Sequence, residues 1–119
     1  MHEMSLTVSL LDIIREEMRR HNASRLRLVR VRAGALTNVV PEALHLAFSV
    51  QTADSDLAGA RLEIIEEALR LGCGNCGLEY EPETPGRAAL LAPCPFCGEE
   101  IGHKLLAGKE LYIDNIEVD

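Results

Sequence analysis

Two closely spaced cysteine pairs constrain this chain more than any other feature. The cysteines are Cys73, Cys76, Cys94 and Cys97. Two thiolates separated by two residues can bind one side of a tetrahedral metal ion, and a second such pair closes the other side. Gly77 and Gly98 directly follow the pairs and suit turns that need a positive φ. The spacing therefore predicts one four-cysteine metal site. A pair of disulfides is the less favoured alternative, because nothing else marks the chain as secreted.

Composition limits the size and class of the protein. With 119 residues, 47% of them hydrophobic and 26% charged, the chain can form one modest domain and a small appendage. A formal net charge of -7 argues against a general nucleic-acid binder, which needs a basic surface. No apolar run is as long as a membrane span, and the start lacks the pattern of a signal peptide. We therefore expect a cytoplasmic protein that binds neither nucleic acid nor membrane.

Two stretches have the periodicity of amphipathic helices. In residues 4–20 the apolar side chains, with Thr7 among them, recur at the spacing of one helix face. Pro41 suits the first turn of a second helix, because a helix does not need the N–H that proline lacks at that position. We expect Leu46 and Val50 to extend the apolar face of this second helix.

Three stretches are predicted to be strands. Residues 25–32 alternate arginine with aliphatic residues, so we expect the arginines to form a solvated face and the strand to stop near Gly34. Residues 61–66 predict a second strand, although a helix over residues 62–71 is also compatible with the pattern. Residues 108–119 predict a last strand with apolar residues on both sides of Asp114.

These elements predict an α+β fold with an insertion. About thirty residues around the cysteines cannot bury enough surface to fold alone, so a bound metal must stabilise them. The last strand needs apolar partners that this small segment does not offer. We therefore expect residues 1–69 and 106–119 to form a domain of two helices and a small three-stranded sheet. Residues 70–105 would be an inserted, ribbon-like or treble-turn zinc module.

A second metal site is conceivable at the start of the chain. The α-amine, the His2 imidazole and the deprotonated amides of His2 and Glu3 would offer Ni(II) or Cu(II) a square-planar nitrogen set. From these two residues alone, an exposed histidine at a frayed terminus is the favoured interpretation. His21 has no partner at ligand spacing and His45 is expected to lie on the surface, so neither is expected to bind metal.

Taken as a whole, the sequence resembles the HypA/HybF family of nickel-insertion proteins. The matching stretches are Met1-His2-Glu3-Met4-Ser5-Leu6, residues 31–48 with Gly34 and Pro41-Glu42-Ala43-Leu44, the two cysteine pairs, and Gly108-Lys109-Glu110-Leu111 followed by Ile116-Glu117-Val118. The resemblance implies that Met1, His2 and Glu3 bind nickel. It also implies that Cys73, Cys76, Cys94 and Cys97 hold a structural zinc. His103, six residues after the last cysteine, is considered as an extra nickel ligand, with an exposed linker histidine as the favoured alternative.

The resemblance implies a nickel metallochaperone that serves [NiFe] hydrogenase maturation, with urease as the other target. Its implied partners are a nickel-delivering GTPase accessory protein and the hydrogenase large subunit, and the chain would be a monomer or a homodimer. We do not expect an enzyme, because no nucleophile and base are paired in the sequence and a four-cysteine site leaves no open coordination position.

Two other functions compete with this interpretation. Cys94-Pro95-Phe96-Cys97-Gly98 is similar to a rubredoxin knuckle, which would hold iron for electron transfer. The cysteines could also belong to a zinc-ribbon interaction module that transfers no metal.

Overall fold

The chain folds into two compact units in the computed structural model, which describes residues 3–84 and 86–119. The first unit comprises the chain up to Arg32 together with Val39–Ile65 and Tyr112–Asp119. The second comprises Ala33–Asn38 and Glu66–Leu111. Each unit is described by itself below. The assignment of a nickel-binding domain to residues 1–69 and 106–119, and of a zinc-binding domain to 70–105, stays a prediction.

Helix α1, Glu3–Arg20, opens the first unit and confirms the helix expected from the apolar spacing. Its buried residues are Thr7, Leu10, Leu11, Ile14 and Met18. Thr7 can be fully buried because its hydroxyl donates to the main-chain carbonyl oxygen of Glu3 at 2.8 Å. A buried hydroxyl that bonds to the preceding turn in this way is not left without a partner. Glu3 in the first turn and the arginines of the last turn complement the helix dipole.

Helix α2, Pro41–Thr52, begins with proline in its first turn, as expected. It buries Leu44, Ala47, Phe48 and Thr52. The prediction that Leu46 and Val50 extend this face is wrong, since they are 65% and 59% exposed. The sheet and α1 cover only one narrow stripe of α2, and these two residues lie outside it. No helix in the described residues is long and apolar enough to cross a bilayer.

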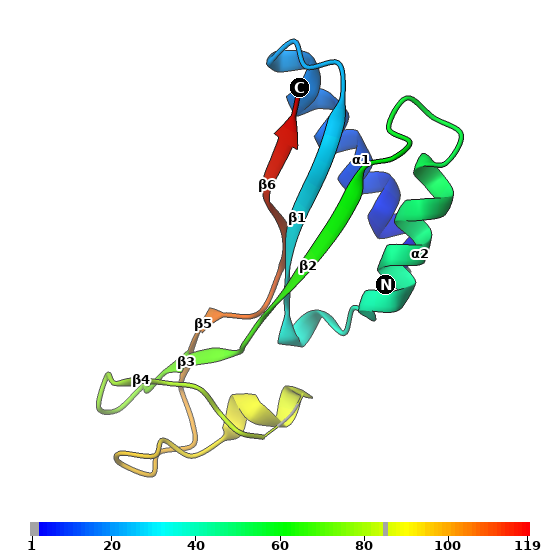
Figure 1. Ribbon diagram of the computed structural model, residues 1–119. Helices are drawn as coiled ribbons and strands as arrows, with labels where there is room; N and C mark the ends of the chain where they lie inside the picture. Colours follow the sequence, from blue (N-terminus) through cyan, green and yellow to red (C-terminus); the bar gives the residue numbers. More distant parts are fainter. Residues whose placement is uncertain (1–2, 85) are drawn as a thin grey trace. The chain divides into compact units, whose positions relative to one another are not determined.

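The sheet of the first unit has the order β2-β1-β6. Its strands are β1, Leu26–Gly34, β2, Arg61–Glu67, and β6, Leu111–Val118. Figure 1 shows β1 and β2 running in the same direction, with the two helices over one face of the sheet. The core between them is mainly aliphatic and includes Leu26, Val29 and Val31 of β1. The strand predicted over residues 61–66 and the predicted last strand are both confirmed.

Burial in β1 changes phase at Leu28 and Val29, which are both buried, so the arginines on either side of this point all reach the open face. The arginines therefore lie on a face open to solvent, as expected, and they also form ion pairs across the sheet. Arg30 donates from Nε to Glu63 of β2 at 2.8 Å and from Nη1 to Glu117 of β6 at 3.0 Å. Arg32 similarly donates to Asp114 of β6 at 3.2 Å. The arginines therefore tie the central strand to both edge strands.

The second unit is built on a small antiparallel sheet of order β4-β3-β5. Its strands are β3, Arg70–Gly72, β4, Glu79–Tyr80, and β5, Lys104–Ala107. Two short 3-10 helices, η1, Ala35–Thr37, and η2, Gly86–Leu91, belong to the same unit. The core is a cluster of buried residues, two of them cysteines: Leu69, Leu71, Cys73, Tyr80, Ala89 and Cys94. The core of this unit and its cysteine pairs are thus parts of one cluster.

A close backbone approach involves Gly34 and Gly108 of the second unit. The first strand ends at Gly34, as expected, and the Gly34 N–H makes its last bond by donating to the Glu110 carbonyl oxygen at 2.9 Å. A Cβ on Gly34 would overlap the main-chain carbonyl of Gly108. Gly108 itself has φ +91°, and a Cβ there would lie 2.7 Å from the Leu69 Cα. Only glycine fits at these two positions.

Gly34→Ala is expected to lower the free energy of unfolding by about 1–3 kcal/mol or more, because backbone atoms cannot move aside as a flexible side chain can. Urea denaturation followed by circular dichroism measures the change. The matched control is Ala35→Ser at the exposed neighbouring position. A surface change of this kind should alter stability by less than about 0.5 kcal/mol. Equal stabilities of the two variants would contradict the overlap.

Arg30→Met should lower the urea midpoint, because it leaves Glu63 and Glu117 without their shared cation. Desolvation acts to lower the pKa of Arg30, but its bonds to Glu117 and Glu63 raise the pKa above its ordinary value. Since salt screens exposed charges, the difference between the two proteins should shrink in about 1 M NaCl. Arg61→Met changes an exposed arginine of β2 that takes no part in these bonds, so this control should show no such salt-dependent loss.

Candidate metal centre

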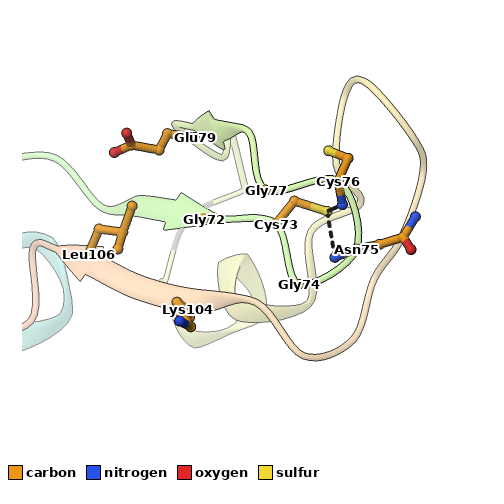
Figure 2. Close-up of a pocket in the computed structure, with 9 residues that line it drawn as sticks. All are labelled: Gly72, Cys73, Gly74, Asn75, Cys76, Gly77, Glu79, Lys104 and Leu106. Atoms are coloured by element: carbon orange, nitrogen blue, oxygen red, sulfur yellow. Dashed lines mark hydrogen bonds between the residues drawn. The ribbon is translucent and has the colours of Figure 1, made fainter.

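The first cysteine pair lies in a tight turn directly after β3. The Cys73 N–H donates to the Leu78 carbonyl oxygen at 2.9 Å, and the Gly77 N–H donates back to the Cys73 carbonyl oxygen at 3.1 Å. Gly77 has φ +78°, as expected from its place after the pair. Figure 2 shows the consequence: the amides of Asn75 and Cys76 both point at the Cys73 sulfur, each at 3.4 Å.

The second pair repeats this geometry. The Cys94 N–H donates to the Glu99 carbonyl oxygen at 2.9 Å, and the Gly98 N–H donates to the Cys94 carbonyl oxygen at 2.8 Å. The Phe96 amide points at the Cys94 sulfur at 3.4 Å, and Gly98 has φ +81°. We call the two turns, residues 73–78 and 94–99, the first and second knuckle.

The four cysteine sulfurs form one cluster, in which all lie within 4.8 Å of one another. Cys73 and Cys97 have their sulfurs 3.5 Å apart, and Cys76 and Cys94 have theirs 3.6 Å apart. These separations are far longer than the roughly 2.05 Å of a disulfide bond. Four thiolates at about 2.3 Å from a tetrahedral zinc would have their sulfurs about 3.8 Å apart. The donor set therefore fits a four-coordinate ion and not the disulfide alternative.

The pKa values of the clustered thiols differ strongly. The amide of Cys76 is the main cause that lowers the pKa of Cys73 to about 6, and the Asn75 amide adds to it. The Leu78 amide acts to lower the pKa of Cys76, but desolvation and the three neighbouring thiols outweigh it and raise the pKa to about 12. Negative charge therefore gathers on part of the cluster, since four thiolates so close together would repel one another. A divalent cation removes that repulsion and lets every thiol ionise.

One contact that the sequence did not indicate joins the two knuckles at the metal cluster. The side-chain amide of Asn75 donates to the Cys97 sulfur at 3.6 Å, and the backbone amide of Glu99 is the main cause that lowers the pKa of Cys97. Asn75 lies between two ligand cysteines, so only its amide character could have marked it. Such donors favour the thiolate form and thus metal binding.

His103 lies within the second unit, close to both knuckles. Its Nδ1 accepts a hydrogen bond from the Gly74 N–H at 3.2 Å, and its Nε2 lies 2.8 Å from the Glu99 carbonyl oxygen. Both ring nitrogens are therefore engaged, and the ring would have to leave these partners to bind nickel. A nickel-binding role for His103 stays a prediction.

Of the predicted nickel ligands, Met1 and His2 lie outside the described residues. Glu3 begins α1, and its carboxylate Oε2 accepts a hydrogen bond from the Val40 N–H at 3.3 Å, at the N-terminus of α2. Its carbonyl oxygen accepts from Thr7. The side chain and carbonyl of Glu3 are thus anchored within the first unit. His21 lies 3.4 Å from a Glu17 oxygen on the surface, and His45 is exposed, so neither joins the cysteine cluster.

Comparison with known proteins identifies the family. A family model described as hydrogenase/urease nickel incorporation, metallochaperone, HypA matches residues 1–118. The hydrogenase maturation factor HypA of Solidesulfovibrio magneticus is 49% identical over 119 residues, and that of Lawsonia intracellularis is 40% identical over 119 residues. Both alignments cover 100% of this chain and of the relative.

Solved structures show that the fold is shared. A solution structure of the Ni metallochaperone HypA from Helicobacter pylori matches with a TM-score of 0.69 at 22% identity. The match covers 99% of this chain and 97% of that chain. A second solution structure, of a HypA protein, matches with a TM-score of 0.71 and the same identity, and covers 99% of this chain and 96% of that chain.

These findings confirm the resemblance and the predicted α+β fold with its four-cysteine cluster. The family's work is metal delivery and not catalysis, so the expectation that the chain is no enzyme is also confirmed. The match over residues 1–118 and the 49% identity across the whole length outweigh the rubredoxin-like and zinc-ribbon interpretations. The chain belongs to the HypA family of metallochaperones for nickel incorporation into hydrogenase and urease.

Proposed function

We propose that this chain carries Ni(II) as transient cargo at its N-terminus for the maturation of [NiFe] hydrogenase, while its four cysteines hold a structural Zn(II). One observation carries the proposal: a chain of the HypA family places four thiols within 4.8 Å of one another in one unit and begins its other unit with Met1-His2-Glu3. The two proposed donor sets, which differ in their chemistry, would thus belong to separate units.

Zinc suits the cysteine cluster because it accepts four thiolates in a tetrahedron and has no redox chemistry of its own. Cys73, Cys76, Cys94 and Cys97 would fill all four positions, so neither water nor a partner's ligand could enter. Such closed coordination suits an ion that stays in place. It also stabilises a unit whose own apolar core is only a few residues.

Nickel suits the N-terminus for the opposite reason. The Met1 amine, the His2 imidazole and the amides of His2 and Glu3 would form a square-planar nitrogen set, which Ni(II) accepts and tetrahedral zinc does not. The anchored carbonyl and carboxylate of Glu3 would give this set a fixed base on α1. A terminus is open to an incoming ligand, so the ion can be passed to a partner by ligand exchange.

The partners we propose are a nickel-delivering GTPase accessory protein and the hydrogenase large subunit, with urease maturation as a second target. These partners operate where thiols stay reduced, and we therefore place the chain in the cytoplasm. A monomer and a homodimer are both compatible with this role.

The untagged protein should contain one zinc per chain and be colourless, and Cys94→Ser should lose the zinc. Elemental analysis measures the metal, and an absorption spectrum excludes thiolate-bound iron. Chelation of the zinc should raise amide exchange in residues 66–111 by at least about tenfold, because those residues depend on the ion for stability.

The matched control is Phe96→Leu, which changes an exposed residue inside the second knuckle and should keep its zinc. An iron absorption band, or a second unit that stays equally protected without metal, would overturn the zinc proposal.

His2→Ala should weaken Ni(II) binding to the zinc-loaded protein by at least about tenfold, and an N-terminal tag should do the same because it consumes the α-amine. Since amine, imidazole and amides must lose protons to bind, affinity should fall between about pH 8 and about pH 6. Titration calorimetry gives the affinity, and nickel X-ray absorption gives the ligand set.

His45→Ala provides the control for loss of an exposed histidine and should bind nickel normally. Nickel affinity that is unchanged in His2→Ala, or unchanged across this pH range, would sink the N-terminal site.

A further inference from the structure

His103 connects the two knuckles through both nitrogens of its ring. Nδ1 accepts from the Gly74 N–H, which lies in the turn between the first two cysteines, at 3.2 Å. Nε2 is 2.8 Å from the carbonyl oxygen of Glu99, which follows the second pair. Gly74 precedes the second knuckle in the sequence and Glu99 ends it, so the imidazole closes a loop that contains all of the second knuckle.

These two contacts define the state of the ring. An N–H donates to Nδ1, so Nδ1 must carry a lone pair. Nε2 faces a carbonyl oxygen, which can only accept, so Nε2 must carry the hydrogen and donate. The geometry thus selects a neutral imidazole with its hydrogen on Nε2. In this state the ring has no lone pair left for a metal ion.

The Glu99 carbonyl oxygen links the ring to a zinc ligand. It accepts from Nε2 of His103 and also from the main-chain N–H of Cys94 at 2.9 Å. On the other side, Gly74 is bonded directly to Cys73 in the chain. Each ring nitrogen is therefore connected to a ligand cysteine through one intervening residue. Nδ1 is connected to Cys73 through Gly74, and Nε2 is connected to Cys94 through Glu99.

Packing around the ring holds it in this position. The ring meets Tyr80 edge to face, with ring centres 5.6 Å apart and planes at 88°. Tyr80 is itself fixed, since its hydroxyl donates to the Ala92 carbonyl oxygen at 2.8 Å. A Cβ on Gly74 would overlap the carbonyl of Gly102, the residue before His103, so only glycine lets the two segments approach this closely.

We propose that His103 is a positioning residue for the four-cysteine site: its imidazole links the first knuckle to the second and holds their thiols in place for zinc. This inference rests on the proposed zinc role of the cluster. Because the ring holds the two knuckles together before zinc binds, less conformational entropy is lost on binding. It acts through Gly74 and Glu99 and does not touch the ion. Partners of this kind typically change metal affinity by about 10–100-fold when they are removed.

The test compares three variants of the full, untagged chain. His103→Phe keeps an aromatic ring beside Tyr80 but removes both hydrogen bonds. His103→Gln keeps an acceptor and a donor at the end of one side chain, so it can bond to Gly74 and Glu99 together. His45→Gln changes an exposed histidine of the first unit and serves as the control.

Competition with a chromophoric chelator should show zinc affinity about tenfold or more weaker in His103→Phe. The affinity should lie within about threefold of the unmodified chain in His103→Gln and be unchanged in His45→Gln. Co(II) in place of zinc should give the same four-thiolate spectrum in every variant, because no ligand has changed. Equal zinc affinity in His103→Phe, or an altered Co(II) ligand set, would overturn the inference.

A second measurement needs no variant and therefore does not depend on whether His103→Phe folds. In the zinc-loaded unmodified chain, nitrogen NMR shifts of His103 should identify the Nε2–H tautomer, and the Gly74 amide should be protected from exchange. An Nδ1–H tautomer or an unprotected Gly74 amide would refute the link. Failure of the unmodified chain to bind zinc at all would instead refute the proposed function of the cysteines.

Discussion

The second unit depends on four sulfur atoms that lie within 4.8 Å of one another. Four thiolates at such distances repel. The Cys76 amide lowers the pKa of Cys73, whereas at Cys76 the effect of the Leu78 amide is outweighed by desolvation and by the neighbouring thiols, which raise the pKa. Cys73 and Cys94 also belong to the small apolar core of this unit. The same positions therefore provide packing and the thiols of the four-cysteine site.

The first unit has a different physical basis. Its mainly aliphatic core lies between two helices and a three-stranded sheet (Figure 1). On the open face of that sheet, Arg30 bonds to a carboxylate on each edge strand. The start of α1 is tied to the start of α2 through Glu3 and Val40. In the proposed function such a platform would present an exchangeable nickel ion at its terminus, while the other unit would hold its zinc permanently.

Short-range patterns predicted most of the elements. The apolar stripe of α1, Pro41 at the start of α2 and the glycine after each cysteine pair all act through neighbouring residues, so the sequence reveals them. Predictions that concerned long-range partners were less successful. Leu46 and Val50 looked like core residues but remain exposed, because α2 is covered on one stripe only. The arginines of β1 lie on the open face as expected, but the sequence did not indicate their carboxylate partners, which come from strands distant in the sequence.

The sequence by itself determined the chemistry of the candidate sites. The cysteine spacing predicted a four-thiol cluster, because the turn geometry within each pair depends only on neighbouring residues. The family could be recognised from the order of several short motifs along the chain. Only the tertiary structure decided what surrounds those ligands. His103 and Gly74 are far apart in the sequence, and their hydrogen bond exists only because β3 and β5 pair in one register. Contacts of this kind depend on chain segments meeting in space, and residue spacing does not encode them.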